Sequence, residues 1–183
     1  MMNKLITIVL VALSLVSCKA PEARKPVTVK TGSFIDASVE RNIKLNAQEK
    51  SSITKVMEQQ PEMDFIASES GFWYYYNSKS EIDSLNTPNF GDIIDYNYNV
   101  KSLNGTLVYS KEDIQAQRYV MDKQELFTGL REGLKLMKTG ETVTFLFPSQ
   151  KAYGYYGDQN KIGSNMPLIC EVTVLAIKEN QSN

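Results

Sequence analysis

Tyrosines and carboxylates are the side chains with which this chain could do chemistry, because it has no histidine. Its 183 residues include 10 tyrosines, 21 aspartates and glutamates, and 2 cysteines. The missing histidine excludes Ser-His-Asp and Cys-His nucleophilic sites, histidine acid–base catalysis and histidine metal sites. Two cysteines are too few for a four-thiolate metal site or a disulfide scaffold. The chemistry must therefore come from carboxylates, hydroxyls, backbone dipoles or an apolar pocket.

The overall composition limits the partners as well. Lysine and arginine number 20 against 21 acidic residues, so the formal net charge is −1. The chain therefore has no excess of positive charge that would attract nucleic acid. The sequence has no glycine-rich phosphate loop and its acidic residues are scattered, so we expect no nucleotide, no metal and no other cofactor. A hydrophobic fraction of 42% and a charged fraction of 22% are typical of globular proteins. The length predicts one domain with appendages.

The first 18 residues are typical of an export signal. Lys4 gives a cationic start, residues 5–16 are almost wholly apolar, and the run ends in Leu15-Val16-Ser17-Cys18. About a dozen apolar residues suit a signal-peptide core and fall short of the ~20 that span a bilayer. The ending resembles the lipobox of bacterial lipoproteins, which implies cleavage before Cys18 and acylation of that cysteine. The alternatives are an ordinary secreted protein with a stray cysteine, or an uncleaved anchor.

Acylation at Cys18 would hold the protein on a membrane. Lys19 follows the cysteine where inner-membrane retention signals often place aspartate, so we expect the outer membrane. No acidic cluster follows, which favours the periplasmic face. Cys170 would then be the lone thiol, and its apolar neighbours predict that it is buried.

We expect three segments: a signal peptide at 1–17, a lipidated tether with one helix at 18–64, and the main domain at 65–183. Residues 19–45 contain prolines and a glycine among polar side chains, which is typical of a tether. Asn46 could cap a helix over 47–60. The apolar positions of that helix are Ile53, Val56 and Met57. The helix could lie on the domain, stand in solvent, or offer a dimer or partner surface.

From about Phe65 the pattern favours strands around one short helix. Leu130, Leu134 and Met137 repeat at helical spacing and predict a helix with one apolar face. Aromatic or alternating runs predict strands, and Asn104-Gly105 predicts a hairpin turn. The expected strands are 70–76, with Trp73 in the core, and 94–100, 106–109, 142–147 and 169–177. Strands on both sides of one helix indicate an α+β fold, an antiparallel twisted sheet wrapped around that helix.

The order of motifs from about Ser70 to Ile177 resembles the FKBP family of peptidyl-prolyl isomerases. The similar pieces, in order, are Gly91-Asp92, Tyr98, Asn104-Gly105-Thr106, the helix signature at 129–141, Ala152-Tyr153-Gly154 and the closing segment 162–172. A lipobox ahead of this domain is most similar to the isomerase lipoproteins associated with gliding motility. The resemblance implies an FKBP-like fold and cis–trans isomerisation of X–Pro bonds in proline-containing client proteins.

That reaction suits a chain without histidine. Rotation about an X–Pro bond faces a barrier of ~18–20 kcal/mol because amide resonance is lost. No covalent bond breaks, and the twisted amide has less charge separation than the planar one. An apolar, desolvated pocket with one or two hydrogen-bond donors is therefore sufficient.

The resemblance assigns roles to nine residues. Tyr153, Leu130 and Tyr98 would be catalytic, with Leu130 as the pocket floor and the Tyr153 hydroxyl on a substrate carbonyl. Phe127 would offer its backbone N–H to another carbonyl, and Ile162 would form the wall near the prolyl amide. The other implied substrate-binding residues are Val108, Tyr119, Leu126 and Cys170. Each of the nine could instead be plain core packing.

The sequence departs from the family at four pocket positions. Active members have Phe-Asp where Val108-Tyr109 stands, a tryptophan at Leu130, Pro-Pro at Gly163-Ser164 and an aromatic residue at Cys170. The pocket is expected to be less aromatic, wider and without its buried carboxylate. Two functions therefore remain open: a prolyl isomerase that speeds folding of envelope proteins, or a lipid-anchored chaperone or assembly factor with little turnover.

Overall fold

The structure, a computed structural model, describes residues 32–81 and 86–180. The chain divides into two units, Met1–Ala37 and Ser38–Asn183, and the sheet, its helix and the site all belong to the second. The predicted signal peptide and Cys18 lie outside the described residues, so the lipid anchor stays a prediction. In the part of the chain that is described, no helix is long and apolar enough to cross a membrane.

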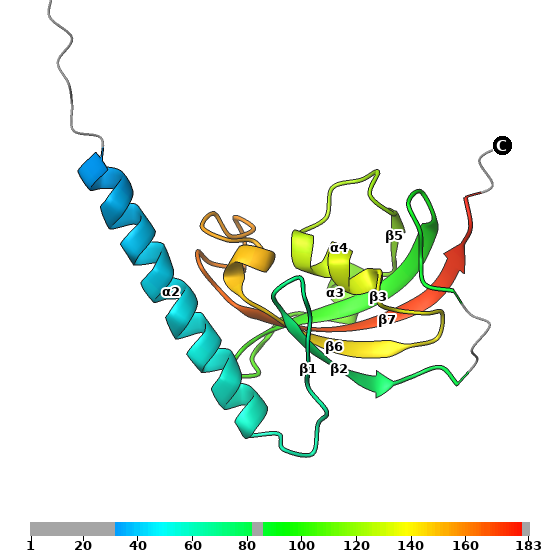
Figure 1. Cartoon of the computed structure of the whole chain (residues 1–183). Helices are drawn as coiled ribbons and strands as arrows, with labels where there is room; N and C mark the ends of the chain where they lie inside the picture. The colour runs from blue at the N-terminus through cyan, green and yellow to red at the C-terminus, as the bar shows by residue number, and fades with distance from the viewer. Residues whose placement is uncertain (1–31, 82–85, 181–183) are drawn as a thin grey trace, which may run out of the picture. The chain divides into compact units, whose positions relative to one another are not determined.

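Within the described residues, seven strands form one antiparallel sheet (Figure 1). Their order is β1-β2-β6-β7-β3-β4, and β5 pairs with β3. The strands are β1 (Ile66–Ala67), β2 (Trp73–Ser78), β3 (Ile93–Ser102), β4 (Leu107–Tyr109), β5 (Gln117–Val120), β6 (Thr142–Phe147) and β7 (Leu168–Lys178). The helices of the described residues are α2 (Gly32–Glu58), α3 (Lys111–Ile114), α4 (Thr128–Leu134) and the 3-10 turn η1 (Ser149–Lys151). The expected α+β fold is confirmed.

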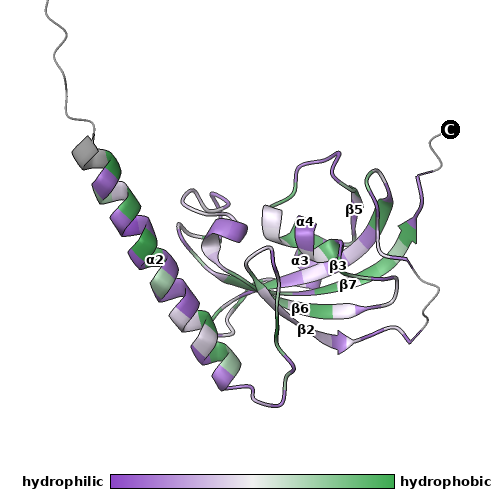
Figure 2. Cartoon of the chain, viewed as in Figure 1, coloured by the Kyte–Doolittle hydropathy of each residue, from purple (hydrophilic) through white to green (hydrophobic). Residues whose placement is uncertain are grey.

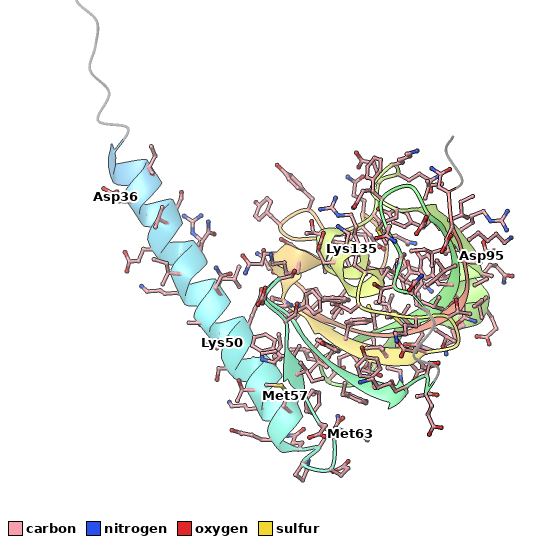
Figure 3. The ribbon with its side chains drawn as sticks, turned by 45° about the vertical axis from the view of Figure 1, so that its right-hand side comes forward. Asp36, Lys50, Met57, Met63, Asp95 and Lys135 are labelled. Atoms are coloured by element: carbon pink, nitrogen blue, oxygen red, sulfur yellow. The ribbon has the colours of Figure 1, made fainter. Side chains whose placement is uncertain are left out.

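One face of the sheet forms the core against α4. Burial alternates along β3, where Tyr96, Tyr98 and Val100 are buried, because successive strand side chains point to opposite faces. Figure 3 shows side chains filling the hollow of the sheet around α4, beside which Lys135 is labelled. The helix and strands β3, β6 and β7 thus enclose one apolar region.

Two glycines let α4 approach the sheet closely. A Cβ on Gly129 would lie 2.5 Å from the Phe147 ring and 2.7 Å from the carbonyl oxygen of Lys151. A Cβ on Gly133 would lie 2.9 Å from the ring of Phe145. These separations are shorter than van der Waals contact in a close-packed interior. The Gly-Leu repeat of the helix signature therefore has a steric cause, since glycine alone fits at both positions without displacing the sheet.

Helix α2 begins at Gly32, whereas the sequence predicted a start after Asn46. The intervening segment has no proline or glycine to end a helix, so the helix runs through residues assigned to the tether. Its end at Glu58 agrees with the stop predicted at Pro61. Figure 2 shows hydrophilic and hydrophobic positions mixed along the helix. Ile53 has no exposed surface, so this part of α2 packs on the domain and does not stand in solvent.

Other sequence-based predictions have mixed outcomes. Trp73 was expected in the core, but Tyr74 and Tyr76 take the core-facing positions of β2 and leave Trp73 on the opposite face. The short elements β1, α3, β5 and η1 were not predicted. The expectation that Cys170 is a buried free thiol is confirmed.

Candidate active site

The nine residues assigned to a pocket lie in one hydrophobic cluster. Those buried within it are Tyr98, Tyr119, Leu130, Ile162 and Cys170. Those partly exposed and packed against it are Val108, Leu126, Phe127 and Tyr153. The structure therefore brings all nine together from β3, β4, β5, β7, α4 and the loops around them. Their roles toward a substrate remain predictions.

Buried apolar groups form the floor of this site. Leu130 on α4 and Cys170 on β7 have no exposed surface, and Ile162 is 2% exposed. The sheet register places Cys170 opposite Val100 and Phe145. Burial raises the pKa of the Cys170 thiol, so the group stays protonated and acts as a small apolar side chain.

Two tyrosine hydroxyls meet above this floor. Burial is the main cause of the raised pKa of Tyr98, and its hydrogen bond with Tyr153 raises that pKa further. Burial also raises the pKa of Tyr153, whereas the hydrogen bond with Tyr98 lowers it. The two hydroxyls therefore influence each other, and both tyrosines stay neutral. A neutral tyrosine hydroxyl can donate one hydrogen bond and accept others.

Phe127 stands directly before α4 in extended conformation, with φ −61° and ψ 141°. Its carbonyl accepts a hydrogen bond from the Arg131 N–H at 3.1 Å. Among residues 32–81 and 86–180, none accepts a hydrogen bond from the Phe127 N–H. Its ring packs on Tyr153 with the centroids 5.2 Å apart. Two groups able to donate, the Phe127 backbone N–H and the Tyr153 hydroxyl, therefore belong to residues whose rings are in contact.

The loop that carries Tyr153 is held by its own backbone. The N–H groups of Ala152 and Gly154 donate to the carbonyl of Ser149 at 2.9 and 2.8 Å. Gly154 has φ +58°, in the left-handed region that favours glycine, and its carbonyl accepts from the N–H of Asn165 at 2.8 Å. The Ala-Tyr-Gly motif thus forms a tight turn that presents the Tyr153 ring toward Phe127.

The structure adds a carboxylate that the sequence did not reveal. Asp158 accepts hydrogen bonds from the Tyr109 hydroxyl at 2.5 Å and from the N–H groups of Asn160 at 2.9 Å and Ile162 at 2.8 Å. The sequence predicted a site without its carboxylate because position 109 is a tyrosine. In the structure, the loop after Tyr153 supplies a carboxylate, Asp158, that accepts a hydrogen bond from Tyr109. We call this set of bonds the Asp158 clasp.

The electrostatics of the Asp158 clasp favour the ionised carboxylate. Burial alone would raise the pKa of Asp158, but hydrogen bonds from Tyr109, Asn160 and Ile162 lower it overall. The bond to Asp158 is also the main cause of the raised pKa of Tyr109. The Lys161 ammonium lies 4.8 Å from the centroid of the Tyr109 ring. The clasp therefore ties β4 to the loop that bears Ile162. The sequence does show an aspartate five residues after Tyr153. Spacing alone could not predict that this aspartate would bond to Tyr109.

The two small residues at the bottom of the site are fully covered. Leu130 and Cys170 are smaller than the aromatic residues of the family, so a wider pocket was expected. Both instead have no exposed surface, because neighbouring side chains close over them. The partly exposed Tyr153 and Phe127 remain as the accessible surface. A hollow of about 190 Å³ on the opposite face of the sheet contains none of the nine residues.

Known proteins resemble this chain in sequence and fold. Residues 85–175 match the family model described as FKBP-type peptidyl-prolyl cis-trans isomerase. The peptidyl-prolyl cis-trans isomerase FKBP10 of Mus musculus is 33% identical over 91 residues, which are 49% of this chain and 16% of that protein. The probable FKBP-type isomerase FkpA of Neisseria meningitidis is 30% identical over 90 residues, which are 49% of this chain and 33% of that protein.

The fold is likewise similar to a solved structure. The crystal structure of FkpA from Escherichia coli superposes with a TM-score of 0.56 at 21% identity and covers 97% of this chain and 82% of that one. The matched region spans less than half the length of the curated relatives named above. Over residues 85–175, the chain belongs to the FKBP-type peptidyl-prolyl cis-trans isomerase family.

Proposed function

We propose that this protein is a peptidyl-prolyl cis-trans isomerase that catalyses rotation of X–Pro bonds in client proteins. The observation that carries the proposal is the pair of donors above a buried apolar floor. Burial raises the pKa of Tyr153, so its hydroxyl keeps the proton that it would donate, and the Phe127 N–H has no acceptor in the described part of the chain.

The geometry suits a reaction without proton transfer. A peptide lying over the site would accept hydrogen bonds from Tyr153 and Phe127 through carbonyls beside the prolyl bond. The apolar cluster on which Tyr153 and Phe127 pack would exclude water from one side of the rotating amide. The twisted amide is less polar than the planar one, so desolvation favours the transition state over the ground state.

The proposal extends to where the protein acts. The motif ending in Cys18 supports lipid attachment at the cell envelope, and Lys19 favours the outer membrane on its periplasmic side. Clients would then be envelope proteins with slow prolyl bonds. The similarity to isomerase lipoproteins of gliding motility supports components of that machinery as clients. Acyl labelling with detergent partitioning tests the anchor: Cys18→Ser should abolish the label, and a labelled variant would exclude this attachment.

A second candidate is a chaperone or assembly factor with little turnover. The closed floor favours it, because a substrate proline has no deep pocket to enter. Tyr155 and Tyr156 are also 72% and 81% exposed on the loop after Tyr153, where they could hold an unfolded chain. In this reading the domain would bind clients without speeding rotation.

Proline-limited refolding distinguishes the two functions. The purified protein is added in catalytic amounts to a client whose refolding is limited by prolyl isomerisation, and to one whose refolding is not. An isomerase accelerates the first alone. A chaperone suppresses aggregation of both at stoichiometric amounts and leaves the prolyl phase at its uncatalysed rate, on the scale of tens to hundreds of seconds.

A further inference from the structure

Helix α2 places a buried carboxylate against the loop of the candidate site. Glu49 is 5% exposed, although Lys50, labelled next to it on α2 in Figure 3, is exposed. Its two carboxylate oxygens accept hydrogen bonds from Ser149, at 2.8 Å from the backbone N–H and at 2.6 Å from the hydroxyl. No cation of the described residues forms an ion pair with Glu49.

Ser149 passes this contact to the two residues that flank Tyr153. Ser149 is 2% exposed and begins η1. Its N–H and hydroxyl face Glu49, while its carbonyl accepts from the N–H groups of Ala152 and Gly154. Ser149 thus contacts α2 through its N–H and hydroxyl, and it binds both neighbours of Tyr153 through its carbonyl. A change at Glu49 would be transmitted through three atoms of Ser149 to the turn that orients the tyrosine.

Simple docking of a helix does not require a carboxylate at this place. Ile53, one turn later on the same face of α2, is fully buried and supplies apolar packing. A buried carboxyl group is costly unless each oxygen finds a donor, and an apolar side chain would avoid that cost. Hydrogen bonds to a carboxylate are short and directional, so they fix the position of the Ser149 backbone.

We propose that Glu49 is a positioning residue of the candidate active site, acting through Ser149 on the turn that holds Tyr153. This inference rests on the proposed isomerase function. It also moves the domain boundary, because the segment 65–183 predicted from sequence would lack the helix that anchors this turn. The functional unit then begins within α2.

Mutations of the Glu49–Ser149 contact test the proposal in the full chain. The variants are Glu49→Ala, Glu49→Gln, Ser149→Ala and the double variant Glu49→Ala/Ser149→Ala. Glu58→Ala removes an exposed carboxylate from the same helix and serves as the matched control. Three readouts are measured: kcat and KM on a prolyl peptide, amide hydrogen exchange of residues 149–154, and the urea midpoint.

Glu49→Ala should lower kcat/KM by about three- to tenfold, because it removes both hydrogen bonds to Ser149 and only part of their free energy reaches the turn that holds Tyr153. Exchange at Ala152 and Gly154 should accelerate while β3 and β7 keep their protection. Glu49→Gln, which retains one acceptor oxygen, should recover part of both effects. Because both residues act through one contact, the double variant should lower kcat/KM no further than the more damaging single variant does.

Two results separate the failure of this inference from the failure of the proposed function. If exchange at Ala152 and Gly154 and kcat/KM match the Glu58→Ala control while the urea midpoint falls, Glu49 stabilises the helix without positioning the site, and the inference is overturned. If the unmodified protein has no isomerase activity, the proposed function fails. The exchange measurement then decides alone whether Glu49 holds the turn.

Discussion

Replacing Leu130 with alanine should weaken both the fold and the site. Leu130 has no exposed surface, lies on α4 and belongs to the hydrophobic cluster that contains Tyr98 and contacts Tyr153. Truncating a fully buried leucine removes its transfer free energy and leaves a cavity, which together cost about 2–5 kcal/mol. A domain of this size is stable by about 5–15 kcal/mol, so the variant should remain folded in buffer and can be assayed.

Leu134 provides the matched control. It is equally buried on α4, one turn further from Phe127. Leu134→Ala should lose similar stability, because the same atoms leave the same core. Leu130→Ala should lose peptide affinity or kcat/KM in addition, since the floor itself is removed.

Urea denaturation and prolyl-peptide kinetics on the two variants check this reasoning. A loss below about 0.5 kcal/mol for Leu130→Ala, far under the range for buried leucines, would show that Leu130 is not part of the core. Equal activity in the two variants would show that Leu130 is structural and does not form the floor of a binding site.

Three further predictions follow from the same geometry. Tyr153→Phe keeps the ring and removes one neutral hydrogen bond of ~0.5–1.5 kcal/mol, so kcat/KM should fall about two- to twelvefold with little change in the urea melt; unchanged activity with a lower melt would make Tyr153 structural. Asp158 has a lowered pKa in the fold, so its contribution to stability is present above the ordinary carboxyl pKa of about 3.9 and should be lost as pH falls through the lower folded value. The difference in urea midpoint between the unmodified protein and Asp158→Asn, measured from pH 7 to pH 3, should shrink toward the acid end, and a constant difference would exclude the Asp158 clasp as the cause. Cys170, buried and with a raised thiol pKa, should resist alkylation until the protein unfolds, and rapid labelling of the native protein would contradict its burial.

The strands and α4 could be predicted because their patterns depend on local spacing. Alternation along β3 and the 4-then-3 spacing of Leu130, Leu134 and Met137 each match the side chains that the structure buries. The family motifs then located the nine cluster residues. Trp73 was misplaced because an all-aromatic run gives no contrast from which to choose the buried face.

The start of α2 and the contacts of Glu49 and Asp158 could not be predicted in the same way. Nothing in residues 33–45 marks a helix start, and the apolar Ile35, Val39 and Ile43 remain exposed. A glutamate at position 49 has the same local pattern as any solvated residue of a helix surface. Its partner lies 100 residues away in sequence, so only the folded chain reveals the pair.

Catalysed refolding by the purified full-length protein tests the central claim most directly. The measurement is the rate of a proline-limited refolding phase at increasing catalytic concentrations, beside Tyr153→Phe at the same concentrations. The account predicts a rate that rises in proportion to the protein added, with a smaller slope for the variant. A rate equal to the uncatalysed one at every concentration, on several clients, would contradict it.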